Sequence, residues 1–249
     1  MSTINLSQIS TKPLKSVDKD ECEAAIKNYL DQLKELQNIL FAQQRYSLLV
    51  ILQGMDASGK DGVINEVFSG VNPMGCRVAG FKKPTEEEIG HEFLWRIHKH
   101  MPQKGMIQIF NRSHYEDVII QKVHKWVDLP SIERRYNHIN AFEQLVSENE
   151  TIILKFYLHV SQEEQLERLE ERLSDPRKMW KYNANDILES KRWPEYMEAY
   201  ETAFNKCSPE IPWTIVPSDK NWYKEYLIAK TIVEALLRLD LSYPALKKA

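Results

Sequence analysis

The sequence predicts an α/β fold in which a parallel sheet is covered by helices on both faces. Short apolar segments alternate along the chain with longer segments of helical periodicity, and this alternation is typical of parallel α/β proteins. The 249 residues are enough to bury the core of one large α/β domain. Hydrophobic residues make up 43% and charged residues 28%, which indicates an ordinary globular protein rather than a disordered or fibrous one.

Charge, hydropathy and cysteine content exclude several classes of protein. The formal net charge of −3 gives no overall basic field, so we expect no nucleic acid partner. The longest apolar run, residues 48–52, is too short to cross a bilayer, so we expect no membrane association. The three widely spaced cysteines match no metal-binding pattern, and with a polar N-terminus they favour a cytoplasmic protein with reduced thiols.

The first elements lead into a glycine-rich turn. Residues 1 to about 19 lack periodicity, and we expect an arm that is loose or packed on a neighbour. A helix is predicted from Asp20, which forms a capping-box pattern with Glu23 ahead of apolar residues at helical spacing. A buried strand is predicted at 47–53 and a helix at about 60–70, on either side of the turn.

The later elements continue this alternation. The predicted segments are a strand near 77–81, a helix at about 85–100, a strand near 106–110, a helix from about Ser113, a helix at about 131–148, a strand at 151–158, a helix from Ser161, a strand at 213–216 and a helix at about 220–239. Ser161 and Glu164 form a second capping-box pattern. With the strand at 47–53, these segments predict a sheet of five strands.

The stretch from 173 to 193 interrupts the rhythm of strands and helices. It combines Pro176 with aromatic and basic side chains, a composition that favours a surface segment over a buried element. We expect it to form a lid inserted between two helices. No repeat, low-complexity tract or linker divides the chain, so residues 1–249 are predicted to form a single domain.

The turn after the first strand is the most informative part of the chain. It has the form Gly54-x-x-x-x-Gly59-Lys60, the first seven positions of the P-loop, between a strand and a helix. Backbone N–H groups in such a turn and the positive end of the helix both favour phosphate. The predicted phosphate-binding residues are Gly54, Met55, Ala57, Ser58, Gly59, Lys60 and Asp61. The alternative is a chance glycine turn, which would not require the flanking strand and helix.

The eighth position of the turn departs from that of nucleotide hydrolases, which place Ser or Thr there to hold Mg²⁺. Asp61 has no hydroxyl, so we expect Asp56, inside the turn, to hold the metal instead. A carboxylate among phosphate-binding amides would repel anions unless a cation lay between them. The alternative is a solvated aspartate that only caps the helix.

A second polar group follows the strand at 106–110, at the end of the strand where open α/β sheets bind ligands. Arg112 suits phosphate because a guanidinium binds two oxygens at once. Glu116 is placed to reach a metal or a nucleotide, and Asn111 to bind water on a metal. The alternatives are a helix cap for Asn111 and a surface ion pair for Arg112.

Three motifs, in this order, resemble those of the polyphosphate kinase 2 family. They are Gly54-Met55-Asp56-Ala57-Ser58-Gly59-Lys60-Asp61-Gly62, Phe110-Asn111-Arg112-Ser113-His114-Tyr115-Glu116 and the lid pattern Trp180-Lys181 … Asp186 … Arg192-Trp193. The resemblance runs from about residue 20 to about 245. It implies a P-loop kinase fold, a three-layer sandwich with a helical lid. It also implies Mg²⁺- or Mn²⁺-dependent phosphoryl transfer between inorganic polyphosphate and AMP, ADP or GDP.

The resemblance also implies roles for individual residues. Asp56, Lys60 and Arg112 are the implied catalytic residues, and Asp56 and Asn111 the implied metal ligands. Asn111 and Glu116 are placed on the nucleotide side. The asparagine form is similar to the subgroup that accepts both AMP and ADP. A homo-oligomer, either a dimer or a tetramer, is implied as well.

A long polyanion needs more positive charge than one lysine and one helix dipole supply. The candidates to line its path are Lys82, Lys83, Arg112, Arg172, Arg177, Lys178 and Lys181. The attacking phosphate oxygen is already ionised near neutral pH, so we expect alignment and charge neutralisation to provide the rate. One phosphoanhydride replaces another, which predicts a reversible reaction, and closure of the lid would exclude water.

Two other functions fit part of the pattern. An ATP-dependent kinase for a nucleotide or small metabolite would use the same turn, although Asp61 and the lack of an acidic residue at the end of the third strand count against it. A non-catalytic regulator that binds phosphate or a nucleotide is the second alternative. Asp56, Lys60 and a cation-rich lid together favour chemistry over binding alone.

Overall fold

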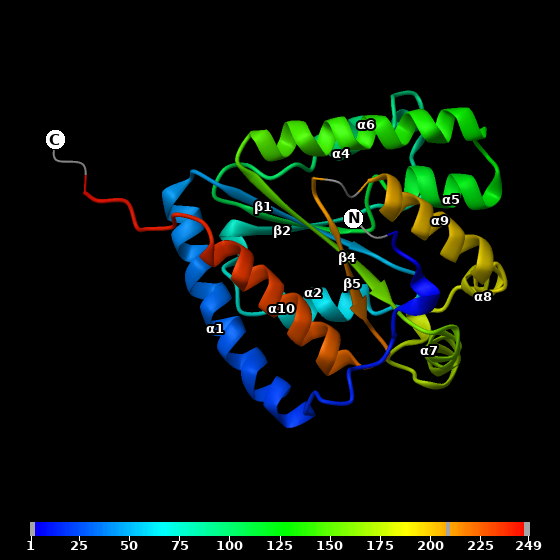
Figure 1. Ribbon diagram of the computed structural model, residues 1–249, viewed down its shortest axis with the longest axis horizontal. Coiled ribbons are helices and arrows are strands. Elements are labelled where there is room, and N and C mark those ends of the chain that lie inside the picture. Colours follow the sequence, from blue (N-terminus) through cyan, green and yellow to red (C-terminus); the bar gives the residue numbers. More distant parts are fainter. Residues whose placement is uncertain (1–2, 208–209, 247–249) are drawn as a thin grey trace.

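The computed structural model describes residues 3–207 and 210–246 (Figure 1). In these residues, five parallel strands form one sheet in the order β2-β3-β1-β4-β5. The strands are β1 (Ser47–Gln53), β2 (Cys76–Gly80), β3 (Ile107–Asn111), β4 (Thr151–His159) and β5 (Trp213–Pro217). The predicted α/β class and the five-stranded parallel sheet are therefore confirmed.

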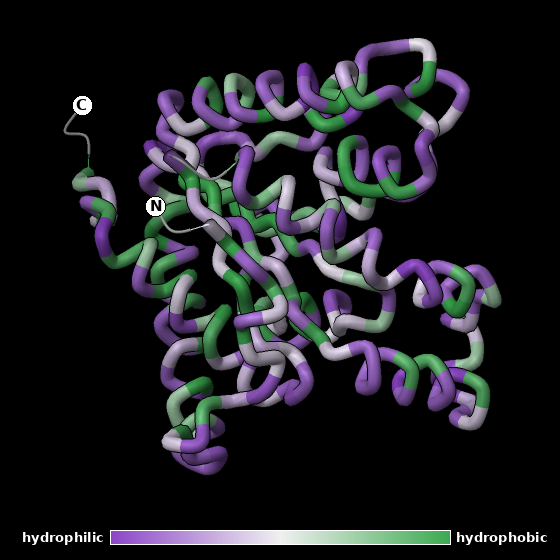
Figure 2. Tube along the Cα trace, turned by 45° about the vertical axis from the view of Figure 1, so that its right-hand side comes forward, coloured by the Kyte–Doolittle hydropathy of each residue, from purple (hydrophilic) through white to green (hydrophobic). Residues whose placement is uncertain are grey.

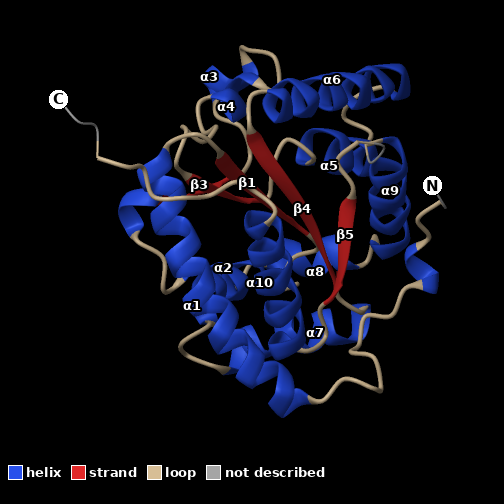
Figure 3. Ribbon diagram, turned by 60° about the vertical axis from the view of Figure 1, so that its left-hand side comes forward, coloured by secondary structure: helices blue, strands red, loops and turns tan. Residues whose placement is uncertain are grey.

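Helices cover both faces of the sheet (Figure 3). On one face lie α1 (Lys19–Gln43), α2 (Lys60–Phe68) and α10 (Asn221–Leu237). On the other face lie α5 (Glu116–His124), α6 (Leu129–Glu148) and α9 (Trp193–Lys206). The remaining helices are the short α3 (Glu86–Ile89), α4 (Trp95–His98) and α8 (Ala184–Ser190), and α7 (Gln162–Ser174) beside the carboxyl edge of the sheet.

Strand β1 is central because both of its faces are buried. Leu48, Val50 and Leu52 belong to the core under α1, α2 and α10, whereas Leu49 and Ile51 belong to the core under α5, α6 and α9. Successive residues of a strand point to opposite faces, so a strand buried on both sides must be apolar throughout. Figure 2 shows hydrophobic segments running through the centre of the molecule, with more hydrophilic helices around them.

Two helix boundaries differ from the prediction. Helix α1 is capped by Asp18, whose Oδ1 accepts a hydrogen bond from the Glu21 N–H at 3.0 Å, so the predicted cap at Asp20 is wrong by two residues. The helix predicted from Ser113 begins at Glu116, because the Ser113 Oγ accepts the Tyr115 N–H at 3.2 Å in a preceding turn.

The single helix predicted at about 85–100 is wrong, because this segment forms the two short helices α3 and α4. Gly90 ends α3, and its N–H group donates to the carbonyl oxygens of Glu86 and Glu87. The Glu92 side chain then accepts the Leu94 N–H at 2.7 Å. A side-chain bond of this kind competes with the helical hydrogen bonds and separates the two turns.

The N-terminal arm packs on its own chain, contrary to the expectation of a loose arm or one packed on a neighbour. Leu6 is buried, and its N–H donates to Glu201 of α9 at 2.7 Å. Thr11 Oγ1 donates to Asp219 at 2.7 Å, beyond the end of β5. This correction applies to the described part of the arm, since residues 1–2 lie outside it.

The segment predicted to be a lid lies between α7 and α9. It contains a 3₁₀ turn, η3 (Met179–Lys181), and α8. The predicted cap of α7 is confirmed, because the Ser161 Oγ accepts the Glu164 N–H at 3.2 Å. Within residues 3–207 and 210–246, no helix is both long and apolar enough to span a membrane.

Candidate active site

The glycine-rich turn, residues 54–60, joins the end of β1 to the start of α2 at the carboxyl edge of the sheet, and we call it the phosphate loop. Its backbone enters the left-handed region at Ala57 (φ 62°) and Gly59 (φ 100°). A side chain at Gly59 would also collide with the buried ammonium of Lys224. The left-handed backbone conformation therefore favours glycine at this position, and a side chain there would also have to displace Lys224.

Lys60 is folded onto the phosphate loop. Its Nζ donates to the carbonyl oxygens of Gly54 at 2.7 Å and Met55 at 3.1 Å, and the side chain is buried. Burial, and then the charge of Arg112, lower the pKa of Lys60 to about 8, although the Asp56 carboxylate opposes this. The ammonium is thus placed beside the loop amides, where a phosphate would replace carbonyl oxygens as its partner.

Asp56 forms an ion pair with Arg112. Strand pairing brings the two together, because Leu52 of β1 lies opposite Asn111 of β3 and the Arg112 N–H donates to the Leu52 carbonyl at 3.0 Å. Burial raises the pKa of Asp56, but the charges of Arg112 and Lys60 outweigh it and hold the pKa below its usual value. Asp56 is therefore an ionised carboxylate in the phosphate loop.

Asp61 lies between strand β3 and the lid segment. Its Oδ1 accepts from Asn111 Nδ2 at 2.8 Å, and its Oδ2 accepts from Lys181 Nζ at 2.8 Å. Burial raises the pKa of Asp61, but the hydrogen bonds from Lys181 and Asn111 outweigh it, so the pKa is lowered. The structure thus brings the predicted residues Asp61, Asn111 and Lys181 together.

Glu116 begins α5, one turn beyond Arg112. Its Oε1 accepts from Gln53 Nε2 at 2.9 Å, and Gln53 is the last residue of β1. Glu116 therefore lies beside the start of the phosphate loop. Gln53 was missed at the sequence level because a strand-terminal glutamine carries no motif.

The lid cations divide into two groups. Arg172 pairs with Asp186 at 2.8 Å, and its charge also lowers the pKa of Asp56. With Lys181, it therefore lies near the phosphate loop. In contrast, Arg177 pairs with Asp175 two residues away, and Lys178 pairs with Glu171, so these two cations are held within their own segment.

Lys82 and Lys83 are exposed at the carboxyl end of β2. The preceding residue, Phe81, donates its N–H to the Asn111 carbonyl at 3.1 Å, which places this loop beside the end of β3. Arg96, which is buried, donates to the Lys82 carbonyl at 2.9 Å and anchors the loop. The two lysines are thus at the predicted edge of the sheet.

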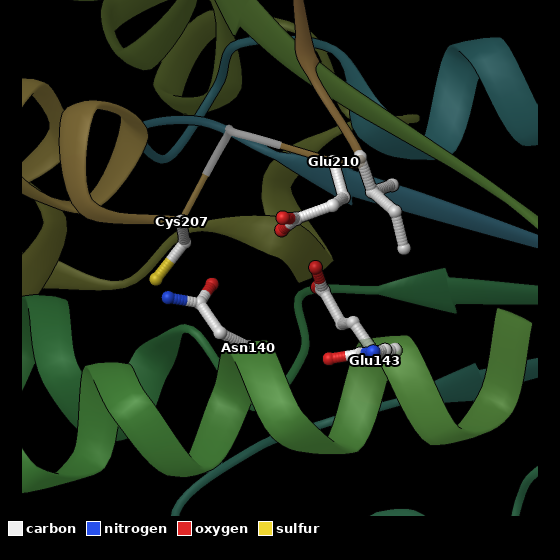
Figure 4. A pocket seen from close by; sticks show the side chains of 6 residues that line it. Asn140, Glu143, Cys207 and Glu210 are labelled. Atoms are coloured by element: carbon white, nitrogen blue, oxygen red, sulfur yellow. The ribbon is translucent and has the colours of Figure 1, made fainter.

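The cavity shown in Figure 4 lies elsewhere, near the start of β5. Asn140 and Glu143 of α6 point into it from one side and Cys207 and Glu210 from the other. Its volume is about 10 Å³, and a space of that size barely holds one water molecule. It is therefore not a candidate for a phosphate or nucleotide site.

A divalent cation at the phosphate loop would need oxygen ligands from the residues around it. Among the described residues, no three His, Cys, Asp or Glu side chains form a ready-made metal cage. Mg²⁺ usually takes one or two carboxylates and completes its shell with water and substrate phosphates. Asp56, which is ionised and part of the phosphate loop, fits that use.

Similarity to known proteins decides the family. The sequence pattern described as Polyphosphate kinase 2 (PPK2) matches residues 16–242. The chain belongs to the polyphosphate kinase 2 family. The resemblance inferred from the three motifs is thereby confirmed.

Individual relatives of the polyphosphate kinase 2 family cover most of the chain. It is 47% identical over 214 residues to the AMP/ADP-polyphosphate phosphotransferase of Meiothermus ruber, which covers 86% of this chain and 80% of that protein. It is 39% identical over 239 residues to the ADP-polyphosphate phosphotransferase of Rhodopseudomonas palustris, covering 91% and 83%. The crystal structure of polyphosphate kinase 2 from Arthrobacter aurescens TC1 superposes with a TM-score of 0.97 at 40% identity, covering 100% of this chain and 90% of that one.

Proposed function

We propose that this protein transfers phosphoryl groups between inorganic polyphosphate and AMP or ADP, with GDP as a further acceptor. The observation that carries the proposal is the grouping of Lys60 and Asp56 of the phosphate loop with Arg112, which reaches the loop from the end of β3. Support also comes from the 47% identity to an AMP/ADP-polyphosphate phosphotransferase. The site offers cations and backbone amides rather than a strong base, as a transfer between phosphates requires.

The chemistry follows from positioning and charge. The ammonium of Lys60 and the loop amides hold the phosphate chain, and the guanidinium of Arg112 neutralises charge on the phosphoryl group in transfer. An ionised terminal oxygen of the nucleotide attacks the terminal phosphorus of the chain. The P–O bond to the rest of the chain breaks, and its electron pair stays on the shortened polyphosphate. The reverse reaction uses the same contacts, so concentration decides the direction.

Mg²⁺, or Mn²⁺ in its place, would be held by Asp56 and Asn111 and would neutralise negative charge on the phosphates. Asp56 is suited to this because it is already ionised within the loop. Glu116 is placed on the nucleotide side in this proposal. Its carboxylate accepts a hydrogen bond from Gln53, the last residue of β1, and so lies beside the phosphate loop.

We further propose that residues 1–249 form one P-loop kinase domain in which segment 173–193 closes as a lid. In this structure Arg172 pairs with Asp186, and Lys181 pairs with Asp61. A bound phosphate chain would replace these carboxylates, draw the lid over the loop and exclude water. Of the remaining predicted cations, Lys82 and Lys83 are placed to follow the chain beyond β2, and Arg177 and Lys178 to follow it at the outer side of the lid.

A homo-oligomer, dimer or tetramer, is part of the proposal. Strand β2 is an edge strand, and the apolar side chains of Val78 on this strand and of Met74 just before it are exposed. The arm at residues 3–18 packs on its own chain, so we expect the contact between subunits to lie elsewhere. Light scattering with size-exclusion chromatography measures the mass; a monomer at assay concentrations would contradict this part of the proposal.

A donor-by-acceptor matrix tests the function. Polyphosphate or ATP is combined with AMP, ADP, GMP or GDP, and new nucleotides are followed by chromatography. We expect ADP and ATP to form from AMP when polyphosphate is the only donor. Turnover with ATP alone as donor would favour an ATP-dependent kinase, and binding without any turnover would favour a regulator.

A further inference from the structure

The carbonyl oxygens of five consecutive loop residues, 54–58, all accept hydrogen bonds from side chains. Lys60 donates to the first two, and helix α7 supplies the donors for the other three. The Nε2 of Gln165 donates to the main-chain carbonyl oxygen of Asp56 at 3.0 Å. The Nη1 of Arg168 lies 3.1 Å from each of the next two oxygens. Two side chains of α7 thus hold three main-chain carbonyls of the phosphate loop.

These carbonyl bonds set the direction of the loop amides. A trans peptide unit is planar, so its C=O and the following N–H point in opposite directions, and the described residues contain no cis peptide bond. Carbonyls held on the side of α7 therefore direct the N–H groups of residues 57–59 away from it. The Ser58 N–H closes the turn on the Met55 carbonyl at 3.1 Å. The Ala57 and Gly59 N–H groups are left in fixed directions, with the repulsive carbonyl oxygens turned away from them.

The guanidinium of Arg168 is held in place by further partners. Its Nε pairs with Glu164 at 2.9 Å, and its Nη2 donates to the Ser218 carbonyl at 2.8 Å, just beyond β5. One planar group therefore joins the phosphate loop to the neighbouring loop of the sheet. A lysine, with a single nitrogen on a flexible stem, cannot make the same set of bonds.

Gln165 connects the phosphate loop to the lid segment. Its Oε1 accepts from the Ser190 Oγ of α8 at 2.7 Å, and both side chains are fully buried. Residues 165, 168 and 172 lie on one face of α7, since residues three and four positions apart are neighbours on a helix. The face that holds the loop carbonyls therefore also carries the lid cation Arg172.

We propose that Gln165 and Arg168 are positioning residues for phosphoryl transfer, which hold the loop carbonyls on the side of α7 so that the amides are oriented for a phosphate chain before it binds. Ser190 joins the lid to the same arrangement through Gln165. This inference rests on the proposed function. The loop amides face the phosphate chain rather than the nucleotide, so variants of these residues should weaken the use of polyphosphate and leave the KM for the nucleotide nearly unchanged.

Variants of Arg168 test the inference by steady-state kinetics, with polyphosphate and ADP varied in turn. We expect Arg168→Met to lower kcat/KM for polyphosphate by about 100-fold, because a small misplacement of the groups that position a substrate can cost that much. Arg168→Lys should recover only part of this loss. The KM for ADP should change by less than about twofold, and Glu167→Gln, exposed on the same helix, should match the wild type.

Two results would overturn the inference. One is an Arg168→Met variant whose kcat falls with the folded fraction while both KM values stay unchanged, which would indicate a purely structural role. The other is an Arg168→Lys variant equal to the wild type, because one ammonium cannot hold both loop carbonyls and also replace the bonds of the guanidinium to Glu164, Ser218 and Asp219. Wild-type turnover with polyphosphate tests the proposed function separately, so the two failures are distinguishable.

Ser190→Ala keeps the test decisive if Arg168→Met does not fold. This variant removes the Ser190 hydroxyl and leaves the Gln165 side chain in place. Loss of one hydrogen bond corresponds to a rise of about three- to tenfold in the KM for polyphosphate, with the KM for ADP unchanged. Calorimetric titration with tripolyphosphate should show the same loss of affinity without turnover. Unchanged tripolyphosphate affinity would contradict the coupling.

Discussion

The Asp56 carboxylate forms an ion pair with the Arg112 guanidinium, which reaches the phosphate loop from the end of the neighbouring strand. The two residues are 56 positions apart in sequence and meet because β1 and β3 are adjacent and parallel. Each neutralises the other in the absence of ligand. A phosphate chain with its cation would separate the pair, offering oxygens to Arg112 and positive charge to Asp56.

Replacing Asp56 tests the metal assignment. Asp56→Asn keeps the size of the side chain but removes the charge, so we expect a kcat lower by at least about tenfold and a higher Mg²⁺ concentration for half-maximal rate. Asp175→Asn, in the pair with Arg177 two residues away in the lid segment, is the control and should behave as the wild type. Full activity of Asp56→Asn at low Mg²⁺ would show that this carboxylate does not hold the metal.

The lowered pKa of Lys60, about 8, predicts how binding depends on pH. The charged ammonium binds phosphate, and it loses its proton as pH rises through that value. Affinity for long polyphosphate, whose inner phosphates do not titrate, should therefore fall above pH 8, by up to about tenfold per pH unit. Binding measured by calorimetry between pH 6.5 and 10 gives the profile.

Lys224 is the control for this profile, because burial also lowers its pKa to about 8 and it lies against Gly59. Lys224→Met should keep the fall in affinity above pH 8 if Lys60 is the group that titrates. If Lys224→Met lost the pH dependence, the titrating group would be Lys224 and not Lys60, and the prediction would be contradicted. Lys60→Ala, which removes the ammonium itself, should abolish nearly all transfer.

The two groups of lid cations should differ in their effect on polyphosphate. Arg172 pairs with Asp186 near the loop, whereas Arg177 is exposed and pairs only with Asp175 among the bonds described. Arg172→Ala should raise the KM for long polyphosphate by about tenfold or more, since charge-assisted bonds are strong, and Arg177→Ala by about twofold at most. Equal losses for polyphosphate and nucleotide in Arg172→Ala would point instead to disrupted folding of the lid.

A buried ion pair predicts a stability effect remote from the phosphates. Lys155 Nζ donates to Glu143 at 2.6 Å and to the Tyr115 hydroxyl at 2.9 Å, and all three side chains are buried. Lys155→Met removes the lysine charge from the buried Glu143 carboxylate, which keeps its hydrogen bonds to His114 and Tyr115. It should lower the free energy of unfolding by about 3–5 kcal/mol. The double variant Glu143→Gln/Lys155→Met should lose less than the sum of the single losses. Urea unfolding measures this, and additive losses would contradict a coupled pair.

The same pair sets an acid dependence of stability. Burial raises the pKa of Glu143, but the charges of Lys155 and His114 and their hydrogen bonds outweigh it, so the pKa is lowered in the folded state. The stabilisation is therefore present above the ordinary pKa of a glutamate and is lost as pH falls through the lowered value. Unfolding free energies at pH 7 and pH 4 should differ less in the double variant than in the wild type.

Much of the fold was predictable because its signals are local. The apolar run of β1 and the turn from Gly54 to Lys60 occupy one continuous segment, so strand, turn and helix could be recognised together. The helix start at Asp18 could not be separated from Asp20, because both are acidic residues ahead of the same apolar pattern. The break between α3 and α4 at Gly90 could not be predicted, because it also depends on the hydrogen bond that the Glu92 side chain accepts from Leu94.

The parts of the site that escaped prediction depend on tertiary packing. Arg168 reaches the phosphate loop across 111 positions of sequence and Gln165 across 109, and neither residue belongs to a recognised motif. The only local signal is their spacing with Arg172 on one helical face. The roles assigned to Asn111, Glu116 and the lid cations remain predictions, although the structure places most of these residues at one edge of the sheet.

The most direct test of the central claim is a phosphorus NMR time course with polyphosphate and AMP as the only phosphate compounds, in the presence of Mg²⁺. The account predicts that the signals of ADP and then ATP grow as polyphosphate is consumed, and that Lys60→Met shows neither. An unchanged spectrum with the wild-type protein, or equal transfer by Lys60→Met, would contradict it.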